Sequence, residues 1–347
     1  MKKIVASLLC LLVVLMAFVG CQSGSQPVAG GAASSGSGAK PTELKMSVTT
    51  SETSVWMVGA NEFKRLVEEL TGGRYIISVF PNEQLSGGDQ AKGVEMLFTG
   101  VTDVDIHSTI IMSGFEPKLS VVSMPWIFPN GNEDVDRILF NGEGGEKLKE
   151  LVEAKGAHVL GIGENGFRQL TNNIRPVNTV EDMKQLKVRT PAMAMYVDFF
   201  KMIGADPTSM IWSEVFTALQ QGTIDAQENP LDTIRSGKVQ EVQKYLSMWN
   251  YSYDPLILSV SNKVWDSLSD EDKAIFEEAG AEAMKVQVEK NRAMDDEILD
   301  SFQEYMEITY PTPEQIDGFK NACKPLYENY KEIIGEDVFA AFGYTFD

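Results

Sequence analysis

Residues 186–230 read LKVRTPAMAMYVDFFKMIGADPTSMIWSEVFTALQQGTIDAQENP, and they carry the strongest structural signal in the chain. The stretch opens with an alternating apolar run, which indicates a short strand, and Arg189 lies at its end. Thr190 is a favourable N-cap and Pro191 suits the first helical position. Apolar residues then recur every three or four positions up to Gly204. The pattern predicts a strand followed directly by a helix.

The position of Arg189 indicates an anion site. Free N–H groups and the helix dipole favour negative charge at the predicted helix start. A guanidinium group also matches a carboxylate with two parallel hydrogen bonds. The alternative is a structural ion pair, because the chain contains 50 Asp and Glu residues. The local residues leave both interpretations open.

Several segments together resemble the DctP-type substrate-binding proteins of TRAP transporters. The resemblance covers almost all of residues 43–335 and is densest in the stretch that ends at Pro230. The segments that carry it are LKVRTP (186–191), GADPTSMIWSEVFTALQQGTIDAQENP (204–230), VQKYL (242–246), GFRQLTNNIRPV (166–177), FPNEQL (80–85) and MPWIF (124–128).

The resemblance implies an α/β fold, a type II-like periplasmic binding protein with hinge strands and a long helix bridging two lobes. Lobe I is expected to comprise residues 43–165 and 254–293, and lobe II residues 166–253 and 294–347. The lobes should close on a carboxylate ligand: a dicarboxylate, a uronate, sialic acid, or another sugar or keto acid. The implied partners are the small and large membrane subunits of a sodium-driven TRAP permease. Neither a cofactor nor an oligomer is expected.

The resemblance also implies a set of residues around the ligand carboxylate. Arg189 matches the carboxylate clamp, and Arg168 and Asn229 match residues that hold the same acid group. Trp212 matches an aromatic position that packs against the ligand. Structural alternatives exist for the last three: an interlobe salt bridge for Arg168, a turn residue for Asn229 and core packing for Trp212.

Four further residues are candidates for contacting the rest of the ligand. Gln84 and Asp89 flank a Gly-Gly turn that faces the cleft in the family pattern. His107 follows an apolar strand of lobe I, where a core position is the alternative, and Tyr253 lies at an expected crossover between the lobes. Aromatic residues placed in the cleft by position alone are Trp56, Trp249 and Tyr251.

The N-terminus has the layout of an export signal. Two lysines precede an apolar run that is short for a membrane span. The sequence FVGC (18–21) resembles a lipobox, in which Cys21 becomes the lipidated first residue; a plain signal peptide is the alternative. We therefore expect a lipoprotein signal peptide at 1–20 and a flexible tether at 21–42. The protein should be exported and held at the outer face of the cell membrane, or in the periplasm, only through its lipid.

Composition narrows the range of partners. The net charge of −20 repels phosphate backbones, so nucleic acid is not expected as a partner. Apart from Cys10 in the signal and Cys21, only Cys323 remains, so no internal disulfide is possible. Stability must then come from a large core, which about 300 residues in two domains can supply.

Strand and helix patterns alternate along the rest of the chain, as expected of an α/β protein. From Ser269, helical spacing continues for about 38 residues, which corresponds to a helix of about 57 Å. This length exceeds one small domain and agrees with a bridging helix. Strands are expected at 43–49, 74–80, 103–108 and 158–163, and helices at 55–70, 89–98, 133–139 and 146–154.

No motif indicates catalysis or a metal site. The segment GIGENG (161–166) matches G-x-G-x-x-G but lacks a following helix, so its glycines are interpreted as hinge residues. With two histidines and no G-x-S-x-G, C-x-x-C or H-E-x-x-H, neither a His-based triad nor a metal site is expected. The competing functions are a secreted enzyme acting on acidic sugars, with Asp225 and Glu228 as an acid pair, and a ligand-sensing ectodomain.

Overall fold

The computed structural model describes residues 40–346, which form one unit. The expected signal peptide, Cys21 and all but the last three residues of the expected tether lie outside the described residues. Within residues 40–346, no helix combines the length and the apolar character needed to cross a membrane.

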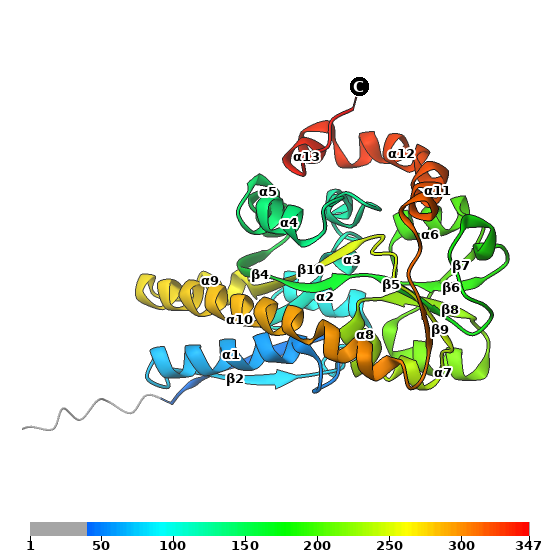
Figure 1. Ribbon diagram of the computed structural model, residues 1–347. Helices are drawn as coiled ribbons and strands as arrows, with labels where there is room; N and C mark the ends of the chain where they lie inside the picture. Colours follow the sequence, from blue (N-terminus) through cyan, green and yellow to red (C-terminus); the bar gives the residue numbers. More distant parts are fainter. Residues whose placement is uncertain (1–39, 347) are drawn as a thin grey trace, which may run out of the picture. The chain divides into compact units, whose positions relative to one another are not determined.

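The first of two mixed sheets has five strands in the order β2-β1-β3-β10-β4 (Figure 1). β1 pairs in parallel with β2 and β3, whereas β10 is antiparallel to both β3 and β4. Its strands are β1 (Thr42–Val48), β2 (Tyr75–Phe80), β3 (Val104–Ser108), β4 (Ala157–Phe167) and β10 (Tyr253–Ser261). The helices attached to this part are α1 (Val55–Leu70), α2 (Gln90–Phe98), α3 (Thr109–Met112), η1 (Pro117–Ser123), α4 (Asn132–Asp134), the π-helix η2 (Val135–Phe140), α5 (Glu143–Glu153) and α9 (Asn262–Trp265).

The second sheet has six strands in the order β11-β9-β5-β8-β6-β7. β6 is parallel to β7 and β8, and β5 is antiparallel to β8 and β9. Its strands are β5 (Gln169–Asn172), β6 (Lys187–Thr190), β7 (Asp206–Ser209), β8 (Ala226–Asn229), β9 (Tyr245–Ser247) and β11 (Glu307–Thr309). The helices of this part are η3 (Val180–Met183), α6 (Ala194–Met202), α7 (Trp212–Gln221), α8 (Leu231–Ser236) and η4 (Val239–Glu241). The expected two-lobed α/β class is confirmed.

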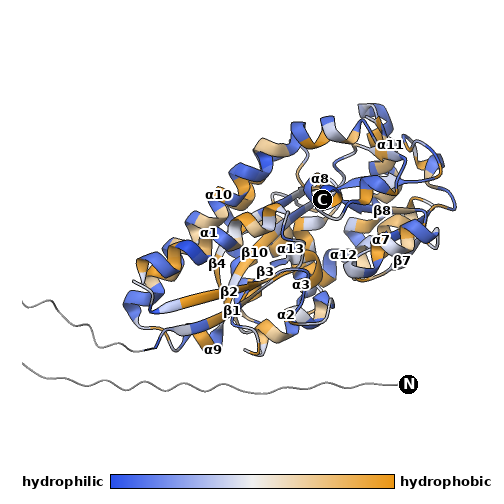
Figure 2. Cartoon of the chain, turned by 90° about the horizontal axis from the view of Figure 1, so that it is seen from below, coloured by the Kyte–Doolittle hydropathy of each residue, from blue (hydrophilic) through white to orange (hydrophobic). Residues whose placement is uncertain are grey.

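Helix α10 (Asp270–Phe302) connects the two sheets. Ser269 caps it by accepting a hydrogen bond from the Asp272 N–H (3.1 Å). The 33 residues correspond to about 50 Å. Phe276 packs into the core of the first sheet, and Phe302 packs with the α7 side of the second. The helix runs beside α1 at one end and passes α8 at the other (Figure 1), and its surface carries prominent hydrophilic segments (Figure 2). The expected bridging helix is present.

Two glycines of GIGENG, Gly161 and Gly163, are required by packing against α10. A Cβ on Gly161 would lie 2.8 Å from the Gly280 carbonyl oxygen, and one on Gly163 would lie 2.3 Å from the Met284 methyl carbon. Both contacts are too short, so these glycines let α10 lie directly on β4. Of the three, only Gly166 has a positive φ, of 109°.

The predicted helix start at Thr190 is wrong. Strand β6 continues through Thr190, which pairs with Ser209 of β7. Helix α6 begins only at Ala194, after the N-cap residue Met193. The physical reason is that a residue before proline is driven to extended backbone, which prolongs the strand. Arg189 is therefore held by a sheet and not by a helix end.

The C-terminal helices pack across the top of both parts (Figure 1). Tyr327 donates to the Pro125 carbonyl oxygen (2.8 Å), which follows η1, and Tyr330 donates to Asp198 of α6 (2.8 Å). This segment therefore ties elements of residues 43–165 to elements of 166–253, and the exact lobe boundaries remain a proposal. The helices are α11 (Pro313–Cys323), α12 (Pro325–Ile334) and α13 (Glu336–Ala341).

Candidate functional site

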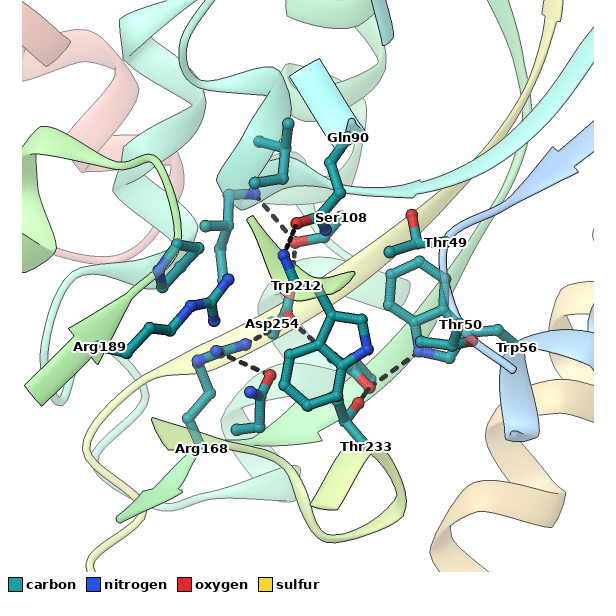
Figure 3. Close-up of a pocket in the computed structure, with 15 residues that line it drawn as sticks. Thr49, Thr50, Trp56, Gln90, Ser108, Arg168, Arg189, Trp212, Thr233 and Asp254 are labelled. Carbon is teal, nitrogen blue, oxygen red and sulfur yellow. Dashed lines mark hydrogen bonds and ion pairs between the residues drawn. The ribbon is translucent and has the colours of Figure 1, made fainter. Parts of the chain in front are cut away.

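A cavity of about 30 Å³ lies between the two sheets, at the carboxyl ends of several strands. Thr49 and Thr50 follow β1, Ser108 ends β3 and Asn229 ends β8. Ligands of open α/β sheets bind outside the carboxyl ends of strands, where the loops diverge. Figure 3 shows Arg189 and Arg168 reaching the cavity on one side and Trp56 on the other.

Arg189 is oriented by the backbone of the strand beside it. Its Nε and Nη2 atoms donate to the Met210 carbonyl oxygen at 2.9 and 2.7 Å. Trp212 covers the guanidinium, with the ring centroid 5.7 Å from its central carbon. A guanidinium carries five N–H groups, so three of them are left for the cavity.

The charge of Arg189 has no carboxylate partner among residues 40–346 at salt-bridge distance. The residue is 2 % exposed. Burial, assisted by the neighbouring Arg168, lowers the pKa of Arg189 to about 9, although Glu228 opposes the shift. The side chain therefore remains charged at neutral pH, although it is held away from water at a cost in free energy. The alternative interpretation, in which Arg189 forms a structural ion pair, is therefore wrong.

Arg168, unlike Arg189, forms ion pairs with two carboxylates. Its Nε and Nη2 atoms grip the Glu228 carboxylate, and Nη1 donates to Asp254 Oδ2 (2.7 Å). Nη2 also donates to Asn229 Oδ1 (2.9 Å). Burial lowers the pKa of Arg168, but Glu228, Tyr196 and Asp254 outweigh this effect and raise it. Arg168 lines the cavity, yet its charge is already balanced by two buried acids.

Asn229 and Trp212 also line the cavity, as expected. Asn229 accepts from Arg168 and donates to Gln227 Oε1 (2.6 Å), which orients its amide. Trp212 is the first residue of α7, and the next residue, Ser213, donates to the Gly88 carbonyl oxygen (3.2 Å). The four residues Arg189, Arg168, Asn229 and Trp212 are therefore brought together.

The other four candidates do not line the cavity. Gln84 is exposed, and Asp89 caps α2 by accepting from the Lys92 N–H (3.1 Å). Tyr253 is buried and donates to Glu164 Oε2 (3.0 Å). Of the aromatic residues placed by position, Trp56 lines the cavity, whereas Trp249 and Tyr251 stack in an aromatic core.

His107 does not line the cavity but contacts a residue that does, and it belongs to a buried polar cluster. Its Nε2 atom is 3.3 Å from Glu83 Oε1 and 3.4 Å from the hydroxyl of Thr49, which does line the cavity. Asp105, two residues earlier on β3, is fully buried, and its carboxylate has no hydrogen-bond partner among the described residues. Burial raises the pKa of Asp105 to about 8, although His107 opposes the shift.

We expect Asp105→Asn to remove a pH-dependent destabilisation. The Asp105 carboxyl has a pKa of 3.8 in the unfolded chain and about 8 in the folded protein. Below pH 3.8 it is neutral in both states, so its ionisation does not affect the free energy of unfolding. As the pH rises from 3.8 to about 8, the folded protein loses stability, because the unfolded chain releases this proton at a lower pH than the folded protein does. The variant should therefore gain up to about 5 kcal/mol of stability relative to the native protein between pH 4.5 and pH 8.5.

The measurement is the free energy of unfolding in urea at several pH values. Asparagine does not titrate, so any fixed effect of its amide cancels when the pH slopes are compared. Asp103→Asn, at the less buried position just before β3, controls for the loss of one acid. Equal slopes for Asp105→Asn and the native protein would show that Asp105 is ionised in both states.

Sequence reasoning missed most of the first-sheet side of the cavity. The missed lining residues with polar side chains are Thr49, Thr50, Gln90, Ser108, Asn165 and Thr233, together with Asp254. The only available signal was position, since three of them follow or end strands at the carboxyl edge. Asp254 follows Tyr253 at the expected crossover but carries no local motif.

Comparison with known proteins gives the family. Residues 46–333 match DctP, described as bacterial extracellular solute-binding protein, family 7. The sialic acid-binding periplasmic protein SiaP of Vibrio cholerae is 31% identical over 301 residues, covering 86% of this chain and 91% of that protein. The 2,3-diketo-L-gulonate-binding periplasmic protein YiaO of Escherichia coli is 33% identical over 280 residues, covering 80% and 83%.

Solved structures agree. A TRAP periplasmic solute-binding protein from Polaromonas bound to D-erythronate has a TM-score of 0.83 at 34% identity, covering 88% of this chain and 99% of that one. Another, from Sulfurospirillum deleyianum with bound succinate, has a TM-score of 0.82 at 28% identity, with the same coverage. The fold and site define an extracytoplasmic solute receptor of two lobes. The chain belongs to the DctP family of TRAP-type periplasmic solute-binding proteins.

Proposed function

We propose that this protein captures a small organic acid by its carboxylate and delivers it to a TRAP permease. The observation that carries the proposal is Arg189, a buried charge that faces the cavity and has no carboxylate partner in the described chain. A bound carboxylate would supply the missing countercharge with two parallel hydrogen bonds. Sialic acid, 2,3-diketo-L-gulonate, D-erythronate and succinate, named for the relatives, are all acids.

Arg168 and Asn229 support the capture from the same side. Arg168 donates hydrogen bonds to Asn229 and to Glu228, and these bonds fix the orientation of Arg168 and Asn229 before a ligand binds. Such preorganisation reduces the entropy that binding must overcome. Trp212 packs on Arg189 and would limit access of water to the ion pair.

Uptake requires the two parts to separate. The cavity, at about 30 Å³, has room for about two water molecules. Contacts between the parts close it: the Trp212 N–H donates to Gln90 Oε1 (3.2 Å), and Arg235 donates to the Thr53 carbonyl oxygen (3.0 Å). We propose that the ligand shifts a hinge equilibrium toward the closed form, in which these bonds are made.

The remaining elements of the proposal concern location and partners. The FVGC segment supports a lipid anchor on Cys21, with residues 22–42 as the tether. The family supports sodium-coupled integral membrane subunits as the recipients of the ligand. The acidic surface keeps the receptor off anionic lipid and leaves the local charge of Arg189 to attract the acid.

The test is a binding screen of organic and sugar acids, each paired with its neutral amide. We expect one or more acids to raise the Tm by several degrees while the matched amide does not, because only the acid neutralises Arg189. Bound acid recovered after denaturation should be chemically unchanged. A screen in which no acid binds, or in which acid and amide bind equally, would contradict the proposed function.

A further inference from the structure

The two arginines that line the cavity differ in their charge partners. This difference, which rests on the proposed capture of a carboxylate at Arg189, limits the class of acid that the cavity can bind. Arg168 contacts two carboxylates, those of Glu228 and Asp254, so that group already carries excess negative charge. Arg189 is the single lining cation, among the described residues, that lacks an acid at salt-bridge distance. One ligand carboxylate balances Arg189, and no cation is left for a second one.

Asp254 lines the cavity and is buried, with an exposed fraction of 1 %. Its Oδ2 atom accepts from Arg168 and from the Asn165 amide (2.8 Å), and its Oδ1 atom accepts from the Ser108 hydroxyl. A carboxylate offers about four acceptor positions, so one remains. In Figure 3, Asp254 lies centrally, with Ser108 and Arg168 bonded to it.

Three of the four Ser and Thr hydroxyl groups of the lining donate their protons to other groups of the protein. Ser108 donates to Asp254, Thr233 donates to Asn165 Oδ1 (2.8 Å), and Thr49 donates to Glu83 Oε1 (2.9 Å). Each oxygen then keeps lone pairs for the cavity, so these groups act as acceptors toward a ligand. Acceptors suit the O–H groups of a ligand and repel the oxygens of another carboxylate.

We propose that the cavity selects a short monocarboxylate that carries hydroxyl groups and that Asp254 rejects dicarboxylates. The ligand carboxylate lies on Arg189, and its hydroxyls donate to Asp254 and to the acceptor oxygens of the first-sheet side. A second carboxylate there meets a like charge in a water-excluded space, where an unpaired ion is strongly disfavoured. Because relatives of this fold are described with both D-erythronate and succinate, the fold alone does not decide between the two classes.

The first test uses calorimetry on the native protein with probes matched in carbon number. At four carbons these are D-erythronate, butanoate and succinate; at six carbons they are D-gluconate, hexanoate and adipate. At one of the two lengths or both, the hydroxylated monocarboxylate should bind at least about tenfold more tightly than both matched acids. Dicarboxylates that bind as tightly as the hydroxy acids would overturn the inference and leave carboxylate capture intact. If no acid binds, the proposed function itself fails, and the inference with it.

The second test assigns the selectivity to Asp254. Asp254→Asn keeps the shape of the side chain but removes its charge. The ratio of dicarboxylate to hydroxy-acid affinity should rise by at least about tenfold, because the negative charge that opposes a second ligand carboxylate is then removed. Asp182→Asn, which alters a carboxylate that caps η3 away from the cavity lining, should leave the ratio unchanged. An unchanged ratio in Asp254→Asn would overturn its role; if that variant does not fold, the native panel still decides the ligand class.

Discussion

Arg189→Met is expected to abolish tight binding of the cognate acid and, at the same time, to raise the stability of the ligand-free protein. The loss of binding follows from the loss of the charge that pairs with the ligand, an effect of about 2–5 kcal/mol for a buried, hydrogen-bonded pair. The gain in stability has a separate cause. Arg189 is buried without a carboxylate partner, and burial lowers its pKa to about 9, so the fold bears the cost of its desolvation.

Methionine matches the arginine side chain as far as the position of Nε and carries no charge. It leaves the Met210 carbonyl oxygen without its two side-chain donors, which costs about 1 kcal/mol. We still expect a net gain of about 1–2 kcal/mol in the free energy of unfolding, because an unpaired buried charge costs more than one lost acceptor. Calorimetric titration with the acid and urea unfolding without it provide the two readouts.

Arg189→Lys separates charge from geometry. Lysine keeps the positive charge but cannot form the planar two-bond fork, so affinity should fall without a gain in stability. Affinity of Arg189→Met within threefold of the native protein would refute the clamp. A fall in stability of the free protein would instead refute the conclusion that this charge is unpaired.

Arg168→Met is expected to have the opposite effect on stability. Removing this side chain leaves two buried carboxylates, Glu228 and Asp254, without their shared cation. Breaking a buried ion pair from one side costs about 3–5 kcal/mol. For a protein of this size the Tm should fall by roughly 10 °C. Thermal unfolding of the ligand-free protein measures the effect directly.

A surface arginine supplies the control for Arg168→Met. Arg65 also contacts two acids, Glu62 and Glu69, but lies in water on α1. Arg65→Met should lower the Tm far less than Arg168→Met does, because an exposed ion pair contributes little to stability. Adding Glu228→Gln to Arg168→Met should recover part of the lost stability, because the orphaned charge is removed. A small effect of Arg168→Met, similar to that of Arg65→Met, would show that Arg168 is free to serve the ligand.

Local patterns predict the elements well where one residue type dominates. Helix α1 begins and ends as expected, since its apolar face repeats at helical spacing. The caps at Asp89 and Ser269 are present, because a short polar side chain before a helix has few better uses. The errors occur where two local preferences compete. Pro191 favours a helix start, yet it also extends the residue before it, and the pairing of Thr190 with Ser209 decides for the strand.

The site divides in the same way. Arg189, Arg168, Asn229 and Trp212 lie in dense segments that resemble a known family, and the structure brings them to one cavity. Thr50, Ser108 and Asp254 have no local signal, because their proximity depends on strands distant in the chain that meet at one edge. His107 illustrates the limit: its strand position is predicted correctly, but which face it occupies depends on the register with β10.

The resemblance to a known family indicated a receptor, and the residues themselves determined an α/β protein with a long helix from Ser269 and an arginine suited to a carboxylate. These features follow from periodicity, caps and side-chain chemistry, which act over a few residues. Only the tertiary structure decided which arginine is free. Arg168 and Arg189 are chemically identical, and each is followed by a polar residue. Their difference arises because folding brings Glu228 and Asp254 to one guanidinium and only a backbone carbonyl to the other.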